Sequence, residues 1–565
     1  MKRIITLLIG LASISAVATE KPPVVSQSKP NILFIMSDDH TTQAFGVYGS
    51  RLAELNPTPN LDKLASEGMV LDNVFCNNSI CVPSRASIMT GQYSAVNEQY
   101  TLGGSLKHDQ QYLAHEMRKA GYQTAVVGKW HLGSRPSAFD YYKVLEGQGR
   151  YTDPEFAEGT LGDTVGTLIE EKGHCSDIVT DTVLDWFKTK RDPAKPFFVK
   201  FHFKAPHGPF RPAPRYKDYL KDVFIPEPET LYTDGNHGSL ATKGKNGELY
   251  PYIGTSVGRR SHFRRFSDKI DKKGKLNPEY TDDQAKSIGY QNYLKSYLGC
   301  VKGVDDNIQR VIDYLKAEGL YDNTVIVYTG DQGFYLGEHD YTDKRWPYDE
   351  SIRMPLIVRY PESIKAGSRN GSIIENVDFA PMLLDYAGVA TPDYMQGKSF
   401  RSILETGEEP EGWKQAAYYH YWLHLVHHRI PANIAIRTAE YKLIFYYSTH
   451  WQKDEPDMAF SWELYDMVND PKEMNNIYDD PKYAVVVKDL KVQLKALRAE
   501  YKEDTDKYPF NKVIDQYWND TEEDRKVAES LIGPYLEACE ATPKSMKDRK
   551  EYLENLNPKL KWDLK

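Results

Sequence analysis

The chain has little cysteine and no excess of positive charge. Only five of its 565 residues are cysteine, and they lack the close pairs that structural zinc sites use. Acidic residues outnumber Lys and Arg by 80 to 71, for a net charge of -9. General nucleic-acid binding needs a basic surface, so we expect no nucleic-acid partner. Any attraction to an anionic ligand must come from a local basic pocket.

Long apolar segments are also missing, apart from a short one at the N-terminus. Two basic residues precede an apolar run at residues 4–14, and an A-x-A cleavage site ends at Ala18. The run is too short to span a bilayer. We therefore predict a signal peptide at residues 1–18, a periplasmic or secreted protein, and no stable membrane anchor. Export permits disulfides, although the sequence does not give their pairing.

Strand and helix signals alternate over the first two-thirds of the chain. The predicted strands are residues 31–36, 69–75, 122–127, 197–203, 324–328 and 356–358. The predicted helices are residues 61–67, 113–120, 178–187 and 283–318, the last of them interrupted. This alternation predicts an α/β fold with a large, mixed, mostly parallel sheet sandwiched by helices. In such sheets, ligands bind beyond the carboxyl ends of the strands.

The character of the sequence changes near residue 397. Four short antiparallel strands are expected between residues 418 and 465, followed by a charged helix at residues 483–501. We therefore predict a main domain at residues 19–400 and a smaller C-terminal α+β subdomain at residues 401–565. A segment rich in Gly, Ser, Lys and Arg, residues 234–275, is expected to be a long surface insertion.

The strongest motif is S-I-C-V-P-S-R-A-S at residues 79–87. Pro83 and the apolar residues after it predict a helix start, with Cys81 at the positive end of the helix. The segment resembles the C-x-P-S-R signature of the type I, formylglycine-dependent sulfatases of the alkaline phosphatase superfamily. The resemblance implies that a dedicated maturation enzyme, which reads Pro83 and Arg85, oxidises Cys81 to formylglycine (3-oxoalanine). The alternative is an ordinary buried cysteine before a helix.

The chemistry implied by this resemblance explains why an aldehyde is needed. A hydrated aldehyde offers one hydroxyl to attack sulfur and a second to expel the sulfate, whereas a plain serine or thiol would be left as a stable ester. The family usually continues with T-G-R, and this chain has Thr90-Gly91-Gln92. One expected arginine is therefore replaced.

Two pairs of oxygen-bearing side chains directly follow predicted strands. Asp38 and Asp39 end the first strand, and Asp331 and Gln332 end a late one. Either pair alone would be read as turn residues. Both are expected at one edge of the sheet, where a cation relieves the repulsion between carboxylates. Oxygen ligands favour a hard cation, so we predict one Ca²⁺. The oxygen of the formylglycine from Cys81, or the sulfate, is expected to complete its shell.

Three further segments extend the resemblance. G-K-W-H-x-G at residues 128–133 implies that Lys129 contacts the sulfate and that His131 assists proton transfer at the diol. A-P-H implies that His207 protonates the leaving alcohol, and T-D-K-R-W implies that Lys344 contacts the ester oxygen. With Cys81 and Arg85, these residues form the predicted catalytic set. A single Lys or His in a sequence usually has no catalytic role and lies on the surface or in the core. These lysines and histidines, however, are all expected at the same edge of the sheet.

The predicted substrate is a sulfated poly- or oligosaccharide. Export, 40 tyrosines and the D-Q-G-F-Y-L-G-E-H block, which resembles carbohydrate sulfatases, favour it. One rival is a phosphonate or phosphodiester hydrolase of the same superfamily. The other is a non-catalytic polysaccharide-binding protein on a sulfatase scaffold, and the intact catalytic set argues against it.

Two basic clusters are candidates for choosing the sugar. Arg264 and Arg265 lie in the predicted insertion, and His428 and Arg429 close a histidine-rich segment that begins at His420. Arginine suits sulfate or carboxylate groups beside the scissile ester. The alternative for the first cluster is a solvated basic loop.

Overall fold

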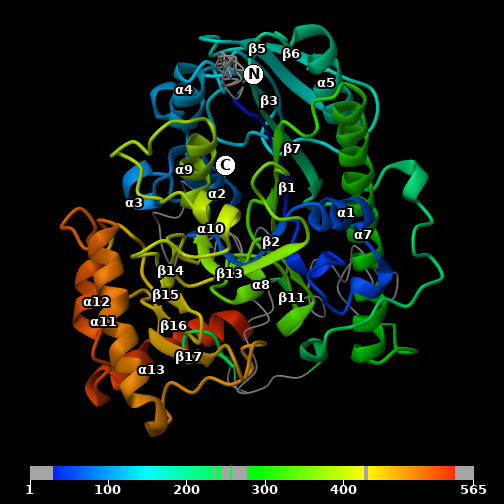
Figure 1. The fold of residues 1–565 in the computed structure, drawn as a ribbon. Coiled ribbons are helices and arrows are strands. Elements are labelled where there is room, and N and C mark those ends of the chain that lie inside the picture. Colours follow the sequence, from blue (N-terminus) through cyan, green and yellow to red (C-terminus); the bar gives the residue numbers. More distant parts are fainter. Residues whose placement is uncertain (1–28, 233–236, 244–254, 257–276, 426–429, 541–565) are drawn as a thin grey trace, which may run out of the picture.

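A ten-stranded mixed sheet forms the centre of the protein (Figure 1). The structure, a computed structural model, describes residues 29–232, 237–243, 255–256, 277–425 and 430–540. The strands are β1 (Asn31–Asp38), β2 (Met69–Phe75), β3 (Gln123–Gly128), β4 (Tyr141–Leu145), β5 (Glu155–Thr160), β6 (Thr167–Glu170), β7 (Phe197–Pro206), β9 (Thr324–Gly330), β12 (Leu356–Arg359) and β13 (Ser368–Glu375). Their order is β13-β2-β12-β9-β1-β7-β3-β4-β5-β6. The signal peptide predicted at residues 1–18 lies outside the described residues.

Strand β1 runs parallel to both of its neighbours, β7 and β9. Strand β12 is antiparallel to β9 and β2, and β5 and β6 form an antiparallel edge. The sheet is therefore mixed and mostly parallel around β1, which confirms the predicted fold class. The expectation from the sequence missed β4, β5, β6 and β13.

Helices cover both faces of the sheet because β1 is apolar on both of its faces. Ile32 and Phe34 pack into one core with helices α2 (Cys81–Thr90), α4 (Tyr112–Lys119), α9 (Phe379–Tyr386) and α10 (Arg401–Thr406). Leu33 and Ile35 pack into the other with α1 (Pro59–Ser66), α5 (Cys175–Asp185) and α7 (Asp282–Ala317). Figure 1 shows α2, α4 and α9 on one side of β1 and α5 and α7 on the other.

Helix α7 runs without a break through 36 residues, so the predicted interruption is wrong. Its glycines made an interruption plausible, because Gly weakens a helix. A Cβ atom at Gly299 would lie 3.1 Å from Pro212, and one at Gly303 would lie 3.3 Å from the ring of Tyr216. The glycines therefore let another segment pack closely against the helix.

The C-terminal part contains a separate four-stranded antiparallel sheet. Its strands are β14 (Ala416–Tyr421), β15 (Asn433–Thr438), β16 (Tyr441–Tyr446) and β17 (Ser461–Asp466). Helices α11 (Ala484–Glu500), α12 (Asn511–Tyr517) and α13 (Glu522–Glu540) follow, and α11 and α12 share an apolar core with the sheet. The exact domain limits, 19–400 and 401–565, stay a prediction.

Part of the predicted surface insertion is buried. Residues 237–243 pack against β17, and Ala241 and Thr242 are fully buried. The hydroxyls of Ser239 and Thr242 donate to Oε1 of Glu463 at 2.7 and 3.0 Å. A buried carboxylate needs such donors, and they hold this part of the segment inside. The expectation of a surface insertion is wrong for these residues.

Within the described part of the chain, no helix combines the length and the apolar character that crossing a membrane requires.

Candidate active site

The carboxyl ends of β1 and β9 bring the predicted metal ligands together. The two strands are parallel, and Ser37 pairs with Gly330 at their ends. The next residues along each strand are Asp38, Asp39 and Asp331, and one carboxylate oxygen from each lies within 4.8 Å of the others. All three side chains are buried. Such a cluster of carboxylates is stable only when cations lie beside it.

The residues of this cluster fit a hard metal ion. Oε1 of Gln332 is buried and accepts no hydrogen bond from a described residue, while Nε2 donates to Oδ1 of Asp39. The pKa of Asp39 is raised to about 7, chiefly by burial and further by the carboxylates of Asp38 and Asp331, against the lowering effect of Lys344. Three carboxylates and one amide oxygen without a partner are the donor set that Ca²⁺ takes.

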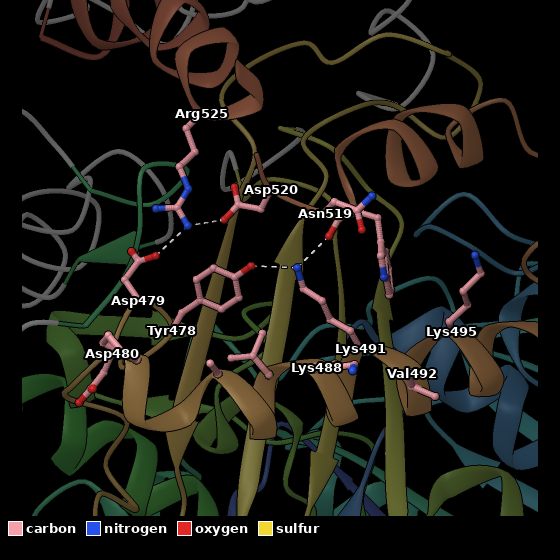
Figure 2. A pocket seen from close by; sticks show the side chains of 14 residues that line it. Tyr478, Asp479, Asp480, Lys488, Lys491, Val492, Lys495, Asn519, Asp520 and Arg525 are labelled. Carbon is pink, nitrogen blue, oxygen red and sulfur yellow. Dashed lines mark hydrogen bonds and ion pairs between the residues drawn. The ribbon is translucent and has the colours of Figure 1, made fainter. Parts of the chain in front are cut away.

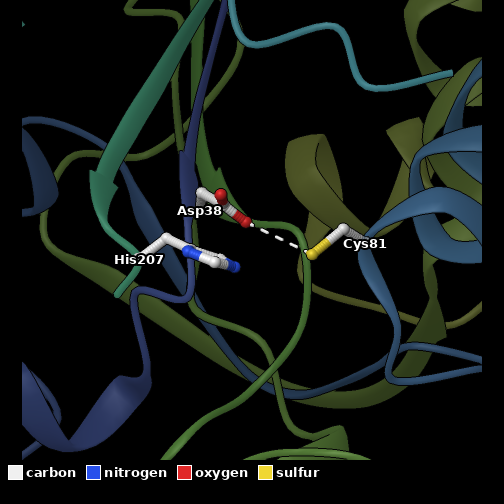
Figure 3. A group of neighbouring side chains, drawn as sticks. All are labelled: Asp38, Cys81 and His207. Atoms are coloured by element: carbon white, nitrogen blue, oxygen red, sulfur yellow. Dashed lines mark hydrogen bonds between the residues drawn. The ribbon is translucent and has the colours of Figure 1, made fainter. Parts of the chain in front are cut away.

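Cys81 is the first residue of α2 and lies beside this cluster. Its Sγ atom is 3.5 Å from Oδ1 of Asp38 and 3.5 Å from Nζ of Lys344. Figure 3 shows Cys81, Asp38 and His207 facing one another, and their potential ligand atoms lie within 4.8 Å. Burial raises the pKa of the Cys81 thiol to about 12. The unmodified thiol is therefore neutral near pH 7 and a poor nucleophile.

Arg85, one turn further along α2, joins the two strand ends. Its Nε donates to Oδ2 of Asp331 at 2.9 Å, and one terminal nitrogen lies 3.7 Å from Oδ1 of Asp38. Another terminal nitrogen donates to the carbonyl oxygen of Lys129 at 2.7 Å. Arg85 is only 2% exposed, so its guanidinium acts inside the site.

Two lysines supply the remaining positive charge. Nζ of Lys129 donates to Asp38, and Nζ of Lys344 donates to Asp39. Both side chains are buried. Lys129 follows β3, whereas Lys344 follows β11 (Tyr341–Asp343), a strand of a small sheet with β8 (Thr255–Ser256) and β10 (Tyr335–Leu336).

Two histidines border the cluster. Nε2 of His207 lies 3.7 Å from Oδ2 of Asp39, and its Nδ1 lies 2.8 Å from the carbonyl oxygen of Gly208. His131 has a left-handed backbone (φ 54°), and its buried Nδ1 has no hydrogen-bond partner within the described chain. Burial lowers the pKa of both imidazoles well below the usual value. Both rings are therefore neutral at pH 7 in this state.

Other predicted residues have different places. Gln92, where the family pattern has arginine, is buried and donates from Nε2 to the carbonyl oxygen of Tyr394 at 2.7 Å. His420 lies in the core of the C-terminal subdomain, 2.6 Å from Glu503 and 2.8 Å from the hydroxyl of Tyr447. The predicted specificity residues lie outside the described residues: Arg264, Arg265, His428 and Arg429.

Sequence reasoning missed two contacts of the site. The amide oxygen of Gln148, in the turn between β4 and β5, accepts a hydrogen bond from Nζ of Lys129 at 2.6 Å. The hydroxyl of Tyr419, on β14, lies 2.7 Å from Oγ of Ser79 and donates to the carbonyl oxygen of Arg345 at 2.7 Å. The C-terminal sheet therefore touches the segments before Cys81 and after Lys344. The glycines on each side of Gln148 were the only sequence signal for the first contact.

Among the described residues, three cysteines other than Cys81 and a groove in the C-terminal part contribute no group to the candidate active site. Cys76, Cys175 and Cys300 are buried and free, as is Cys81, and the side chain of Cys539 is outside the described part. A groove of about 560 Å³ lies between α11 and the segments around residues 479 and 519 (Figure 2). Two of its cations pair with neighbouring polar groups: Lys491 with Tyr478 and the carbonyl of Trp518, and Arg525 with Asp479 and Asp520.

Comparison with known families gives two matches. The model of the family described as Sulfatase matches residues 30–389. The model described as N-sulphoglucosamine sulphohydrolase, C-terminal, matches residues 337–500. The first match spans every predicted catalytic and metal residue.

Individual proteins and structures are also similar. An N-acetylglucosamine-6-O-sulfatase of Bacteroides thetaiotaomicron is 40% identical over 528 residues, which cover 88% of this chain and 91% of the relative. A solved structure in complex with its substrate D-glucosamine-2-N,6-O-disulfate is 39% identical, with a TM-score of 0.73, and the match covers 86% of this chain and 100% of that one. A phosphonate monoester hydrolase from Silicibacter pomeroyi (24% identity, TM-score 0.62, 84% and 96% covered) shares the fold.

Proposed function

The chain belongs to the sulfatase family and is a sulfuric ester hydrolase, and on that premise we propose that it removes sulfate esters from sulfated carbohydrates. The sugar class is supported by the relative that is 40% identical and named for N-acetylglucosamine 6-O-sulfate. It is also supported by the similar structure that holds a glucosamine disulfate. We propose a 6-O-sulfated glucosamine unit as the first substrate to test.

The observation that carries the catalytic proposal is the position of Cys81. It lies at the N-terminus of α2, between the carboxylate of Asp38 and the ammonium of Lys344. A neutral buried thiol cannot attack sulfur, so we propose that a maturation enzyme oxidises Cys81 to formylglycine. Formylglycine supplies a hydrated aldehyde, one hydroxyl of which attacks sulfur while the other later expels the sulfate.

The proposed metal is one Ca²⁺ held by Asp38, Asp39, Asp331 and Gln332. Its ligands are oxygens only, and the unpartnered Oε1 of Gln332 gives it a neutral donor. A bound Ca²⁺ supplies positive charge that polarises the sulfate. Sγ of Cys81 lies 3.5 Å from Oδ1 of Asp38, so a formylglycine at this position would complete the shell.

Charged side chains hold the sulfate group in this proposal. Lys129, Arg85 and Lys344 converge on Cys81 from three different elements, and each is at least nine-tenths buried. In a site that excludes water, their charges stabilise the transition state more strongly than they would in solvent. These residues bind the sulfate group, and other residues must contact the sugar.

His207 supplies the proton that the leaving sugar oxygen needs. In the free site its Nδ1–H donates to the carbonyl oxygen of Gly208, and the neutral Nε2 faces Asp39. The negative charge of an arriving sulfate favours the protonated ring, so Nε2 then carries a proton toward the ester oxygen. Lys344 stabilises the negative charge that develops on that oxygen.

Sulfate release from defined sugars tests this function. The protein is produced together with a formylglycine-generating enzyme, and sulfate released from N-acetylglucosamine 6-sulfate is measured by ion chromatography. Turnover by the wild type and none by Cys81→Ser, made without a serine-converting enzyme, is the expected result. A wild type that hydrolyses bis-aryl phosphodiesters in preference to every sugar sulfate would favour the phosphodiesterase instead.

A further inference from the structure

The candidate active site is buried at its centre and bordered by three partly exposed residues, which we call its mouth. Cys81, Lys129 and Lys344 are at most 2% exposed. His207 is 21% exposed, and His131 and Gln148 are also partly exposed. A sulfate that reaches Cys81 therefore leaves its sugar beside these three residues. Two of them have roles in proton transfer, and Gln148 has none.

A tight turn presents Gln148. The turn begins the connection from β4 to β5, and both flanking glycines have left-handed backbones, with φ of 51° at Gly147 and 69° at Gly149. A Cβ atom at Gly149 would lie 2.9 Å from Leu145, and the amide of Gly149 donates to the carbonyl oxygen of Glu146 at 2.8 Å. Glycine avoids the strain that another residue would meet there. The turn therefore has a defined shape.

Two buried lysines fix Gln148 in place. Nζ of Lys129 donates to its amide oxygen at 2.6 Å, and Nζ of Lys204 donates to its carbonyl oxygen at 2.9 Å. Lys204 is 2% exposed, and its ammonium lies 5.2 Å from the centre of the Tyr151 ring. The Tyr151 hydroxyl donates to the carbonyl oxygen of His207 at 2.6 Å. One short segment thus contacts both Lys129 and the loop of His207.

We propose that Gln148 contacts the substrate and hydrogen-bonds a hydroxyl group of the sugar ring that carries the scissile sulfate. This inference rests on the proposed carbohydrate substrate. Because Lys129 occupies the amide oxygen, the Nε2 hydrogens of Gln148 remain as donors, and no described residue accepts from them. The sulfate is anionic and meets the lysines and arginine inside. A neutral amide at the mouth suits a neutral hydroxyl.

The test compares a sugar sulfate with an aryl sulfate that has no hydroxyl groups. Gln148→Ala should raise KM for N-acetylglucosamine 6-sulfate about tenfold, because one hydrogen bond to the sugar is lost. It should lower kcat/KM for 4-nitrophenyl sulfate by a clearly smaller factor, because that substrate feels only the lost bond to Lys129 and not the lost bond to the sugar. Gln148→Met keeps the volume of the side chain and should show the same difference between the sugar sulfate and the aryl sulfate. It replaces the alanine variant in the test if that variant does not fold.

Arg150→Ala is the matched control. Arg150 lies in the same connection and pairs with Glu170 on the surface at 3.4 Å. Its replacement should therefore leave KM and kcat/KM for both substrates unchanged. Parallel losses on both substrates would overturn the proposal, because Gln148 would then act only through Lys129. An unchanged KM for the sugar would also overturn it.

Failure of the proposed function would give a different result from failure of the role of Gln148. If the wild type prefers another sugar sulfate, the same comparison is made with that sugar. A wild type that cleaves the aryl sulfate and no sugar sulfate in a broad panel would overturn both the proposed function and the role of Gln148.

Discussion

Nε of Arg85 donates a hydrogen bond to Oδ2 of Asp331 at 2.9 Å, and both side chains are buried. This bond joins the helix that begins with Cys81 to the strand end that carries two of the proposed metal ligands. The same guanidinium reaches the carbonyl oxygen of Lys129 at 2.7 Å. A planar group with several donors can join three elements at once, and a lysine ammonium of the same charge cannot match that geometry.

Arg85→Lys should therefore impair the enzyme even though the charge is kept. We expect kcat/KM for a sugar sulfate to fall at least about 100-fold, in the range seen when a group that stabilises transition-state charge is removed. Arg118→Lys is the control, because Arg118 pairs with Asp140 at 2.9 Å where both side chains are 31% exposed. The measurement is kcat/KM of the two variants from steady-state kinetics. Equal kcat/KM values for Arg85→Lys and Arg118→Lys would show that the geometry of Arg85 is unimportant.

Removing the metal should abolish activity and lower the melting temperature. Without a cation, Asp38, Asp39 and Asp331 repel one another in a buried site. Ca²⁺ added after chelation should restore both properties. Gln332→Ala should cost less than Asp331→Ala, because it removes a neutral donor. Activity that survives thorough chelation, or that returns with Zn²⁺ and not with Ca²⁺, would contradict the proposed site.

Calcium binding should depend on pH near neutrality. Burial raises the pKa of Asp39 to about 7 in the metal-free site, well above the value expected in an unfolded chain. A raised carboxyl pKa means that the proton is held up to about pH 7 and must leave before Ca²⁺ binds. Affinity should thus rise about tenfold from pH 6 to pH 8. Calorimetry in two buffers would detect the released proton, and a constant affinity would exclude this coupling.

His207→Ala should have an effect that depends on the leaving group. A sugar alkoxide leaves poorly without a proton, so the rate on a sugar sulfate should fall about 10²–10⁴-fold. The phenolate of 4-nitrophenyl sulfate leaves readily, and the loss there should be much smaller. Single-turnover rates on both substrates make the comparison. Equal losses would show that His207 is not the general acid.

The sequence predicted which carboxylates would lie together, because one physical rule governs their positions. Parallel strands end at a common edge, so residues that directly follow β1 and β9 had to meet. Asp39 and Asp331 are such residues, and Asp38 is the last residue of β1. Cys81 was placed by the proline that starts a helix. Each of these positions depends on local pattern and on the order of strands in the sheet.

Contacts between distant segments were not predictable from the sequence. Tyr419 lies on a strand of the C-terminal sheet, and nothing near it in the sequence indicates that it touches Ser79 and Arg345. Gln148 meets Lys129 because of the path of a turn at the end of β4. The continuity of α7 was missed for the same reason, because the partner that fills the space beside Gly299 comes from a segment more than 80 residues away.

The mass of the peptide that contains Cys81 tests the central claim most directly. Active enzyme is digested, and the peptide is examined by mass spectrometry. The account predicts that the thiol mass is lost and that the aldehyde, or its hydrate, is present at this position. Fully active enzyme in which Cys81 carries only an unmodified thiol would contradict it.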